Sequence, residues 1–315
     1  MILSEFRTYF NEQLSNVFPK TEVDTFFFLL TEEILKLQRI DVALNPRFKI
    51  SESDIITLKK ALSKLQNQEP IQYILGNTEF YGLPFKVNNH TLIPRPETEE
   101  LVAWIISDLK DKSIVTSNGV EKSLNILEIG TGTGCIPITL AKNIPNATIT
   151  SIDISSEALI IAKENAKLND VHINFIEQNI LTTKNLNVIA NKMKQSQNND
   201  KITSSQTPRN DIRFDIIVSN PPYVRNLEKV EIQPNVLENE PHLALFVDDN
   251  NPLIFYDKIA DLAKIHLKEN GELYFEINQY LGKEIIEMLT EKGFYSVLRK
   301  DIFGNDRMTK SVFKL

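Results

Sequence analysis

The chain has 315 residues, enough for two domains, and 42% of them are hydrophobic, so a substantial core can form. Charged residues make up 24%, which is ordinary for a globular protein and argues against general disorder. The formal net charge of −7 excludes a broadly basic nucleic-acid-binding surface, although it allows a local basic patch or a basic protein partner.

The sequence shows no feature of a secreted or membrane protein. It has one cysteine, Cys135, so it cannot form an internal disulfide. The N-terminus lacks the basic and then apolar segments of a signal peptide. The most apolar run, Phe26–Leu30, is far shorter than the ~20 residues that a membrane span needs. We therefore expect a soluble, cytoplasmic protein that does not bind membranes.

The first part of the chain predicts a small bundle of helices that ends near residue 68. Apolar side chains recur there every three or four residues, which gives each helix one apolar face. Thr21 is a candidate cap for the second helix, and Ser51 or Ser53 for the last one. The apolar stretches are Phe6–Val17, Val23–Ile34 and Ile55–Leu65. We expect residues 1–68 to form a separate N-terminal domain.

Residues 69–90 change pattern and predict a β-hairpin that links two domains. Short apolar runs are typical of strands, and glycine and proline separate them as they do in turns. The runs are Tyr73–Leu75, Glu79–Tyr81 and Phe85–Val87, and the turn residues are Gly76, Gly82 and Pro84.

Predicted strands and helices alternate through the second domain, residues 91–315, which is typical of a mostly parallel sheet with helices on both faces. The strands are Leu124–Ile129, Thr148–Ile152, Ile173–Ile176, Phe214–Val218, Glu272–Ile277, Tyr295–Arg299 and Val312–Leu315. Helices include Ser156–Leu168 and Leu281–Lys292, the latter stopped by Gly293. Residues 182–211 are rich in polar side chains and lack aromatic ones, which predicts a mobile surface insertion.

A glycine-rich run, Gly130-Thr131-Gly132-Thr133-Gly134, follows the first of these strands and enters a helix. Glycine there allows a tight turn and lets a ligand approach the backbone closely. Asp153 ends the next strand, where a carboxylate can accept hydrogen bonds from both hydroxyls of a ribose. Taken singly, these features are also compatible with a structural turn and a helix cap. Together they predict a nucleoside site.

Another run, Asn220-Pro221-Pro222-Tyr223, directly follows the fourth predicted strand and should therefore lie beside the glycine-rich run. The side-chain oxygen of Asn220 and the carbonyl of Pro221 could accept both N–H groups of a planar amide or amine and direct its electron pair. The two prolines stiffen the turn, and the Tyr223 ring could pack on the planar group. A rigid turn without chemistry is the alternative. We expect methyl transfer to nitrogen, helped by proximity of the donor.

The chain resembles the release factor glutamine methyltransferases, the HemK/PrmC family, from about residue 69 to residue 307. The glycine-rich and Asn-Pro-Pro-Tyr runs are shared by many amino-methyltransferases, whereas Pro94-Arg95-Pro96-Glu97-Thr98-Glu99 is more specific and selects this family. The other matching segments are Glu69–Gly76, Leu92-Ile93, Glu240-Pro241 with Ala244-Leu245, Glu276-Ile277 with Gln279, and Gly304 with Arg307.

The resemblance implies a Rossmann-like class I methyltransferase domain with a seven-stranded sheet, preceded by a helical domain that recognises the substrate. It implies transfer of a methyl group from S-adenosylmethionine to the side-chain N5 of the glutamine in the Gly-Gly-Gln motif of peptide chain release factors, with S-adenosylhomocysteine as product. By this likeness, Gly130–Gly134, Asp153 and Asn220 should contact the cofactor, and Asn220–Tyr223 the glutamine. The segment 182–211 is unusual, because the family's connection there is usually short.

Other polar residues have weaker functional interpretations. Arg95 and Glu97 could bind or order the substrate, with Glu99 nearby, or these residues could form surface ion pairs. Asn179, after the third strand, could hydrogen-bond an adenine edge or simply form a turn. The 4 histidines lack metal-ligand spacing, and there is a single cysteine, so we expect no metal site.

Two other functions remain open at this point. An adenine-N6 methyltransferase acting on DNA or RNA would use the same Asn-Pro-Pro-Tyr run, although the acidic net charge and the lack of a basic stretch argue against direct nucleic-acid contact. A nucleoside-binding adaptor without enzymatic activity would bind the cofactor but would not turn it over.

Overall fold

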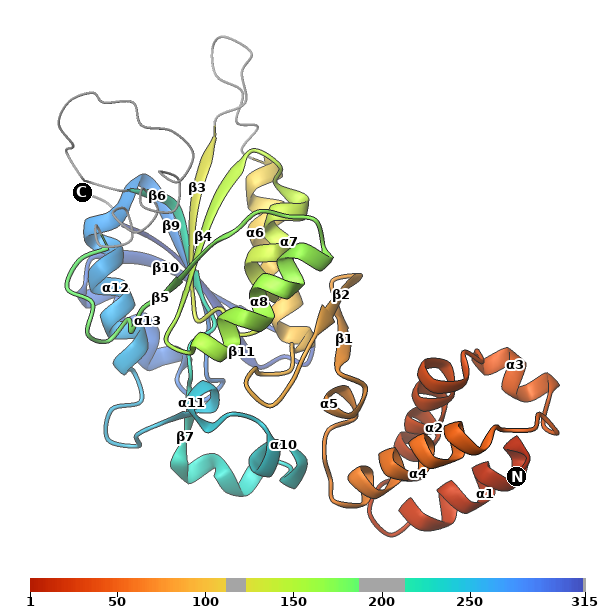
Figure 1. Cartoon of the computed structure of the whole chain (residues 1–315). Helices are drawn as coiled ribbons and strands as arrows, with labels where there is room; N and C mark the ends of the chain where they lie inside the picture. Colours follow the sequence, from red (N-terminus) through yellow and green to blue (C-terminus); the bar gives the residue numbers. More distant parts are fainter. Residues whose placement is uncertain (112–122, 187–212, 314–315) are drawn as a thin grey trace. The chain divides into compact units, whose positions relative to one another are not determined.

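The computed structural model describes residues 1–111, 123–186 and 213–313 (Figure 1). The polar segment 182–211, for which we predict a mobile insertion, lies outside the described residues from position 187 onward. No helix in the described part of the chain is long and apolar enough to span a membrane. The chain divides into two compact units, which we name the helical unit and the sheet unit.

The helical unit comprises Met1–Asn77 together with Ile232–Asn239, a later segment that the sequence did not assign to it. Its helices are α1 (Leu3–Leu14), α2 (Lys20–Leu35), α3 (Arg39–Leu44), α4 (Glu52–Gln66), α5 (Ile71–Leu75) and α10 (Pro234–Asn239). Aromatic side chains fill its core, where the rings of Phe10 and Phe27 meet edge to face with centroids 5.7 Å apart. Ser51 caps α4, because its hydroxyl accepts a hydrogen bond of 3.1 Å from the amide of Asp54.

Two expectations for this unit are wrong. Thr21 does not cap α2, because the helix already begins at Lys20 after Pro19. The predicted strand at 73–75 is the helix α5, which Pro70 precedes and Gly76 ends. Its apolar residues Ile71, Ile74 and Leu75 lie three and four positions apart, so that all of them reach the core of the helical unit.

The sheet unit, Thr78–Glu231 with Glu240–Leu315, contains a seven-stranded sheet in the order β10-β11-β9-β6-β3-β4-β5. The strands from β9 to β5 are parallel to one another, and β11 is antiparallel to both β9 and β10, which confirms the predicted mostly parallel sheet. The strands are β3 (Leu124–Ile129), β4 (Ala147–Asp153), β5 (Asn174–Glu177), β6 (Phe214–Ser219), β9 (Leu267–Glu276), β10 (Phe294–Lys300) and β11 (Asp306–Phe313).

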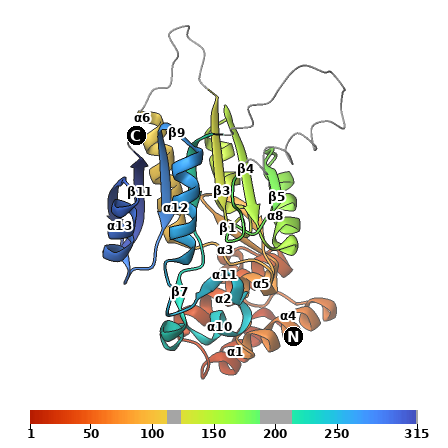
Figure 2. The ribbon, with the colours of Figure 1, turned by 90° about the vertical axis from the view of Figure 1, so that its left-hand side faces the viewer.

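Helices cover both faces of this sheet (Figures 1 and 2). The helices α6 (Pro96–Asp111), α7 (Cys135–Asn143) and α8 (Ser156–Leu168) lie on one face, and α12 (Ile254–His266) and α13 (Gly282–Glu291) lie on the other. Side chains alternate between the faces along each strand. Tyr274 packs with α6 and α7, for example, whereas its neighbour Phe275 packs with α12 and α13.

Smaller elements complete the sheet unit. The hairpin of β1 (Asn77–Phe80) and β2 (Leu83–Lys86) packs Phe80 and Phe85 into the core on the α6 face. After β6 come β7 (Val224–Arg225), the 3-10 helix η2 (Asn226–Glu231), α11 (His242–Leu245) and β8 (Phe246–Val247), and β7 pairs with β8.

The last strand begins earlier than its sequence predicts. We expected Val312–Leu315, but β11 starts at Asp306 and pairs with β9 and β10 along its length. Polar residues make this strand hard to recognise in the sequence. One of them, Lys310, forms ion pairs with Asp108 at 2.6 Å and Glu272 at 2.8 Å within the sheet unit. Partly buried charged side chains of this kind are compatible with an interior strand only because their partners lie on neighbouring elements.

Candidate active site

Near their carboxyl ends, the five parallel strands have residues that are aligned across the sheet. Across β5, β4, β3, β6 and β9, the aligned residues are Ile176, Ile152, Ile129, Ser219 and Phe275. The residues that directly follow this row are Glu177, Asp153, Gly130, Asn220 and Glu276. The chain runs from β3 outward to β4 and β5 on one side and to β6 and β9 on the other, so the order reverses between β3 and β6. Ligands of open α/β sheets bind at such a point.

The glycine-rich run forms a loop between β3 and α7. Gly132 has φ +52°, and a Cβ added there would meet no atom within 4 Å, so its backbone is open to a ligand. Gly134 has φ +81°, and an added Cβ would lie 2.9 Å from Cδ1 of Ile138 and 3.3 Å from Cβ of Ala162. The two glycines therefore have different roles. Gly134 allows α7 and α8 to pack closely, and Gly132 leaves space for a ligand.

Asp153, the last residue of β4, binds the glycine-rich loop through its carboxylate. Its carboxylate accepts hydrogen bonds of 2.9 Å from the amides of Gly132 and Ser155, one on each oxygen. Each oxygen retains a second lone pair for a ligand hydroxyl. Burial raises the pKa of Asp153, and the backbone hydrogen bonds oppose this shift. The N-cap of α8 is Ser155, whose hydroxyl accepts the amide of Ala158 at 3.1 Å, so Asp153 is not the residue that caps this helix.

The Asn-Pro-Pro-Tyr turn follows β6, and the glycine-rich loop follows the adjacent strand β3 at the same level of the sheet. The hydroxyl of Ser219 donates a 2.6 Å hydrogen bond to the carbonyl of Ile129, which ties the ends of β6 and β3 together. A Cβ added at Gly130 would lie only 3.5 Å from the carbonyl oxygen of Asn220. The two runs that the sequence singled out therefore lie side by side at the ends of paired strands.

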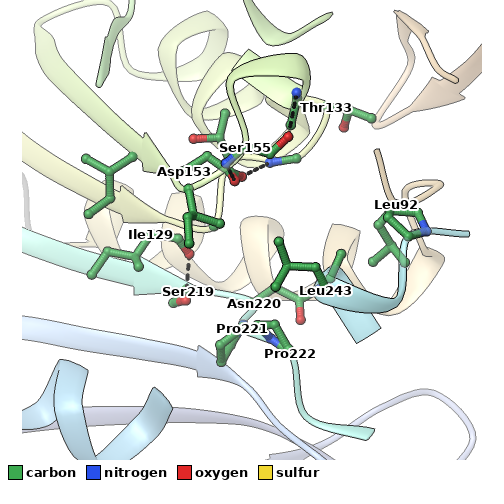
Figure 3. A pocket seen from close by; sticks show the side chains of 18 of the residues that line it. Leu92, Ile129, Thr133, Asp153, Ser155, Ser219, Asn220, Pro221, Pro222 and Leu243 are labelled. Carbon is green, nitrogen blue, oxygen red and sulfur yellow. Dashed lines mark hydrogen bonds between the residues drawn. The ribbon is translucent and has the colours of Figure 1, made fainter. Parts of the chain in front are cut away.

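A cavity of about 360 Å³ lies over these strand ends. Figure 3 shows Asp153 and Ser155 toward one end of it and Asn220, Pro221 and Pro222 toward the other. The predicted site residues that line the cavity are Arg95, Gly130, Thr131, Gly132, Thr133, Asp153, Asn179, Asn220, Pro221 and Pro222. Gly134, Tyr223 and Glu97 are not among the lining residues. The size is within the range of ordinary small-molecule sites.

Asn179 and Tyr223 make contacts that the sequence interpretation did not specify. The side-chain oxygen of Asn179 accepts the amide of Leu181 at 2.9 Å, which is the turn alternative, although the residue also lines the cavity. The hydroxyl of Tyr223 donates to Oε1 of Glu276 at 3.1 Å. Packing of the Tyr223 ring on a substrate stays a prediction, as does contact of Asn179 with adenine.

Two residues near Asn220 were not singled out from the sequence: Thr98 and Glu276. Nδ2 of Asn220 donates to the hydroxyl of Thr98 at 3.2 Å, and this hydroxyl donates to Oε2 of Glu276 at 2.6 Å. Both residues are buried, and Thr98 lines the cavity. Their only signal in the sequence was membership of two segments that resemble the same family.

Arg95 contributes to a wall of the cavity through an ion pair. Its guanidinium lies 2.6 Å from Oε1 of Glu240, which is buried, and the amide of Ile93 donates to Oε2 at 3.2 Å. Glu240 thereby joins the segment before α6 to the segment of Pro241, which also lines the cavity. Glu97 does not line the cavity; burial is the main cause of the raised pKa of Glu276, and the negative charge of Glu97 adds to it.

Cys135 begins α7 and lines the cavity, and burial raises the pKa of its thiol to about 12. The thiol is therefore uncharged at neutral pH. Among the described residues, no group of three or more His, Cys, Asp or Glu side chains could hold a metal ion.

Comparisons with known proteins agree with this geometry. Residues 120–305 match a family described as "Methyltransferase domain", and the sheet order and cavity are those of a Rossmann-like class I methyltransferase. The protein is therefore a methyltransferase. Residues 5–76 match the "PrmC N-terminal domain".

Curated relatives narrow the assignment. A release factor glutamine methyltransferase of Flavobacterium psychrophilum is 51% identical over 100% of both chains. One of Bacteroides thetaiotaomicron is 38% identical over 97% of this chain and 98% of its own. The chain belongs to the release factor glutamine methyltransferase family.

Two glycines of the glycine-rich loop, Gly132 and Gly134, should respond differently to substitution. Gly132→Ala should destabilise the fold by about 1 kcal/mol, because the left-handed backbone disfavours a Cβ. Gly134→Ala should cost about 1–3 kcal/mol more, because its Cβ would also press on Ile138 and Ala162. Equilibrium unfolding of the intact chain in denaturant measures both values. Equal losses for the two variants would contradict the packing role of Gly134.

Proposed function

We propose that this protein transfers the methyl group of S-adenosylmethionine to the side-chain N5 of the glutamine in the Gly-Gly-Gln motif of a peptide chain release factor. The observation that carries the proposal is that the glycine-rich loop and the Asn220 turn follow paired strands and that residues of both line one cavity. A nucleoside-binding feature and a pair of amide acceptors thus lie side by side. Because release factors act at the ribosome, we place the reaction in the cytoplasm.

The cofactor side of the cavity suits S-adenosylmethionine. Gly130–Gly134 would carry the backbone approach, with Gly132 leaving the space that a ligand needs. Asp153 would accept the ribose hydroxyls on its remaining lone pairs. Ile154, Ile180 and Phe255 give the cavity an apolar lining suited to a purine. When bound, this cofactor supplies a methyl group on a positively charged sulfur.

The nitrogen side of the cavity is formed by the Asn220 turn. An amide nitrogen is a weak nucleophile, because its electron pair is delocalised into the carbonyl group. Oδ1 of Asn220 and the carbonyl of Pro221 would accept its two N–H groups and hold the electron pair toward the methyl carbon. The prolines fix the backbone there, so the acceptors need not reorganise during transfer. Proximity of the two reactants does the remaining work.

The proposal is tested by incubating the protein with methyl-labelled S-adenosylmethionine and a purified release factor. Label should enter the release factor and should be absent from a variant whose Gly-Gly-Gln glutamine is replaced by alanine. DNA and RNA are incubated in parallel, because an adenine-N6 methyltransferase would label these instead. Cofactor binding without label in any acceptor would favour the adaptor function.

Asn220→Ala should lower the rate of methyl transfer by about 100- to 1000-fold, because it removes one of the acceptors that orient the amide. The denaturation midpoint should change little. A matched control is Asn226→Ala, which removes a side chain that bonds the carbonyl of Val247 outside the cavity lining. Full activity of Asn220→Ala would refute the acceptor role.

We further propose that the N-terminal domain selects the release factor. In support, Ile40 and Leu44 of α3 are 58% and 71% exposed and lie one helical turn apart, so that they present one apolar surface. Such a surface can bind a protein partner.

The double variant Ile40→Glu with Leu44→Glu should raise the KM for release factor about tenfold or more, with cofactor affinity unchanged. Ile160→Glu, at a residue of α8 that is 56% exposed, is the control in the sheet unit. Steady-state kinetics with each substrate varied in turn separates the effects. Equal loss of affinity for both substrates would argue against this domain role.

A further inference from the structure

We propose that Glu276 and Thr98 are positioning residues that set the orientation of the Asn220 amide, so that its oxygen, rather than its NH2 group, faces the substrate nitrogen. This inference rests on the function proposed above and adds to it the device that gives the acceptor its direction. It rests on the hydrogen bonds that lead from Glu276 through Thr98 to Asn220.

Strand geometry brings these residues to one place. Val218 and Tyr274 face α6 and α7, so the residues two positions later, Asn220 and Glu276, return to that face at the ends of β6 and β9. The first turn of α6 lies on the same face and carries Thr98. The resulting contacts join residues that are 122 and 178 positions apart in the chain.

The donors and acceptors in this chain of bonds can be arranged in one way when Glu276 is ionised. A carboxylate only accepts hydrogen bonds, so the single hydroxyl proton of Thr98 is used at Oε2 of Glu276, at 2.6 Å. The Thr98 oxygen can then only accept, and the Asn220 group that faces it at 3.2 Å must be Nδ2. Oδ1 of Asn220 is thereby directed elsewhere, and none of the described residues donates a hydrogen bond to it.

The opposite orientation of the Asn220 amide is unfavourable both toward Thr98 and toward the substrate. A flipped Asn220 would place Oδ1 against the Thr98 oxygen, so two acceptors would face each other without a proton. It would also present an NH2 group to the NH2 group of a glutamine substrate, and two donors cannot bond. The direction of one buried hydrogen bond therefore decides whether the site is matched to its substrate.

The surroundings hold Glu276 in place. Its Oε1 accepts the hydroxyl of Tyr223 at 3.1 Å. Arg307, paired with Asp301 at 3.2 Å, favours the ionised form of Glu276, whereas burial and the charge of Glu97 disfavour it. Burial is the largest of these influences, and it raises the pKa of Glu276 above the ordinary value.

Protonation of Glu276 should therefore weaken the orientation of Asn220. A neutral carboxyl group can donate to Thr98, which frees the Thr98 proton to point at a flipped Asn220. Because the pKa of Glu276 is raised, its ionised form is lost as the pH falls through a value above that of an ordinary glutamate. We expect the rate constant for methyl transfer to fall over the same acidic range.

The test uses variants that keep size but change the hydrogen bonds. Thr98→Val removes the hydroxyl, and Glu276→Gln replaces an obligate acceptor by a group that can also donate. Each should lower kcat with release factor by about 10- to 100-fold, as expected for loss of a buried hydrogen bond, with cofactor affinity nearly unchanged. Thr98→Ser keeps the hydroxyl and should retain kcat within about threefold.

Tyr256→Phe is the matched control, because it removes a buried hydroxyl that bonds the backbone of Glu276 and leaves the carboxylate contacts intact. It should retain kcat within about threefold. In addition, Glu276→Gln should lose the acidic fall in rate that the unaltered protein shows. Denaturation midpoints of all variants are measured to separate unfolding from a loss of orientation.

The outcomes distinguish this inference from the proposed function. If the unaltered protein does not methylate a release factor, the proposed function fails. If it does, and folded Thr98→Val and Glu276→Gln keep its kcat, only the positioning role is overturned. Should those variants not fold, the role is still overturned if the rate of the unaltered protein stays constant down to the pH at which it unfolds.

Discussion

The register of the parallel strands is the constraint on which the site depends. The glycine-rich loop, Asp153, Asn220 and Glu276 all begin one residue beyond the same aligned row. A slip of β6 by one residue would turn the Asn220 side chain to the opposite face of the sheet and away from α6. The hydrogen bond from Ser219 to Ile129 opposes such a slip, because it joins the two strands at the last residue of each.

This edge of the sheet also gathers carboxyl groups whose pKa values are raised by burial. The pKa of Glu128 rises to about 8, and those of Asp153 and Glu276 also rise, because exclusion of water disfavours the charged form. A positively charged ligand would favour ionisation of the carboxyl groups near it and would lower their pKa values. By reciprocity, ionised carboxylates strengthen binding of the cation. The sulfonium of the proposed donor would therefore favour the ionised forms of the carboxyl groups near it.

Local patterns explain which parts of the structure could be predicted. The bounds of β3 and α8 follow from the sequence, because an apolar run marks the strand and a continuous helical stretch comes after the next strand. The start of β11 did not follow, because partly buried polar residues such as Lys310 find partners only in the tertiary structure. In the same way, the glycine-rich loop and the Asn220 turn were predictable as neighbours, whereas the bonds of Thr98 to Asn220 and Glu276 depend on how α6 packs.

The segment before and within the start of α6 connects the separate parts of the site. Pro96 is the first residue of the helix, a position that its missing N–H group suits, and this places Thr98 in the first turn. Just before it, Arg95 and Ile93 bind Glu240, whereas Thr98 binds Glu276 and Asn220. One short segment therefore fixes a wall of the cavity at one end and the acceptor amide at the other. The three segments that resemble the family at residues 92–99, 240–241 and 276–277 are distant in sequence, yet the first is hydrogen-bonded to both of the others. The segment at 92–99 thus supplies hydrogen-bond donors to two buried carboxylates, Glu240 and Glu276, whose burial would otherwise be costly.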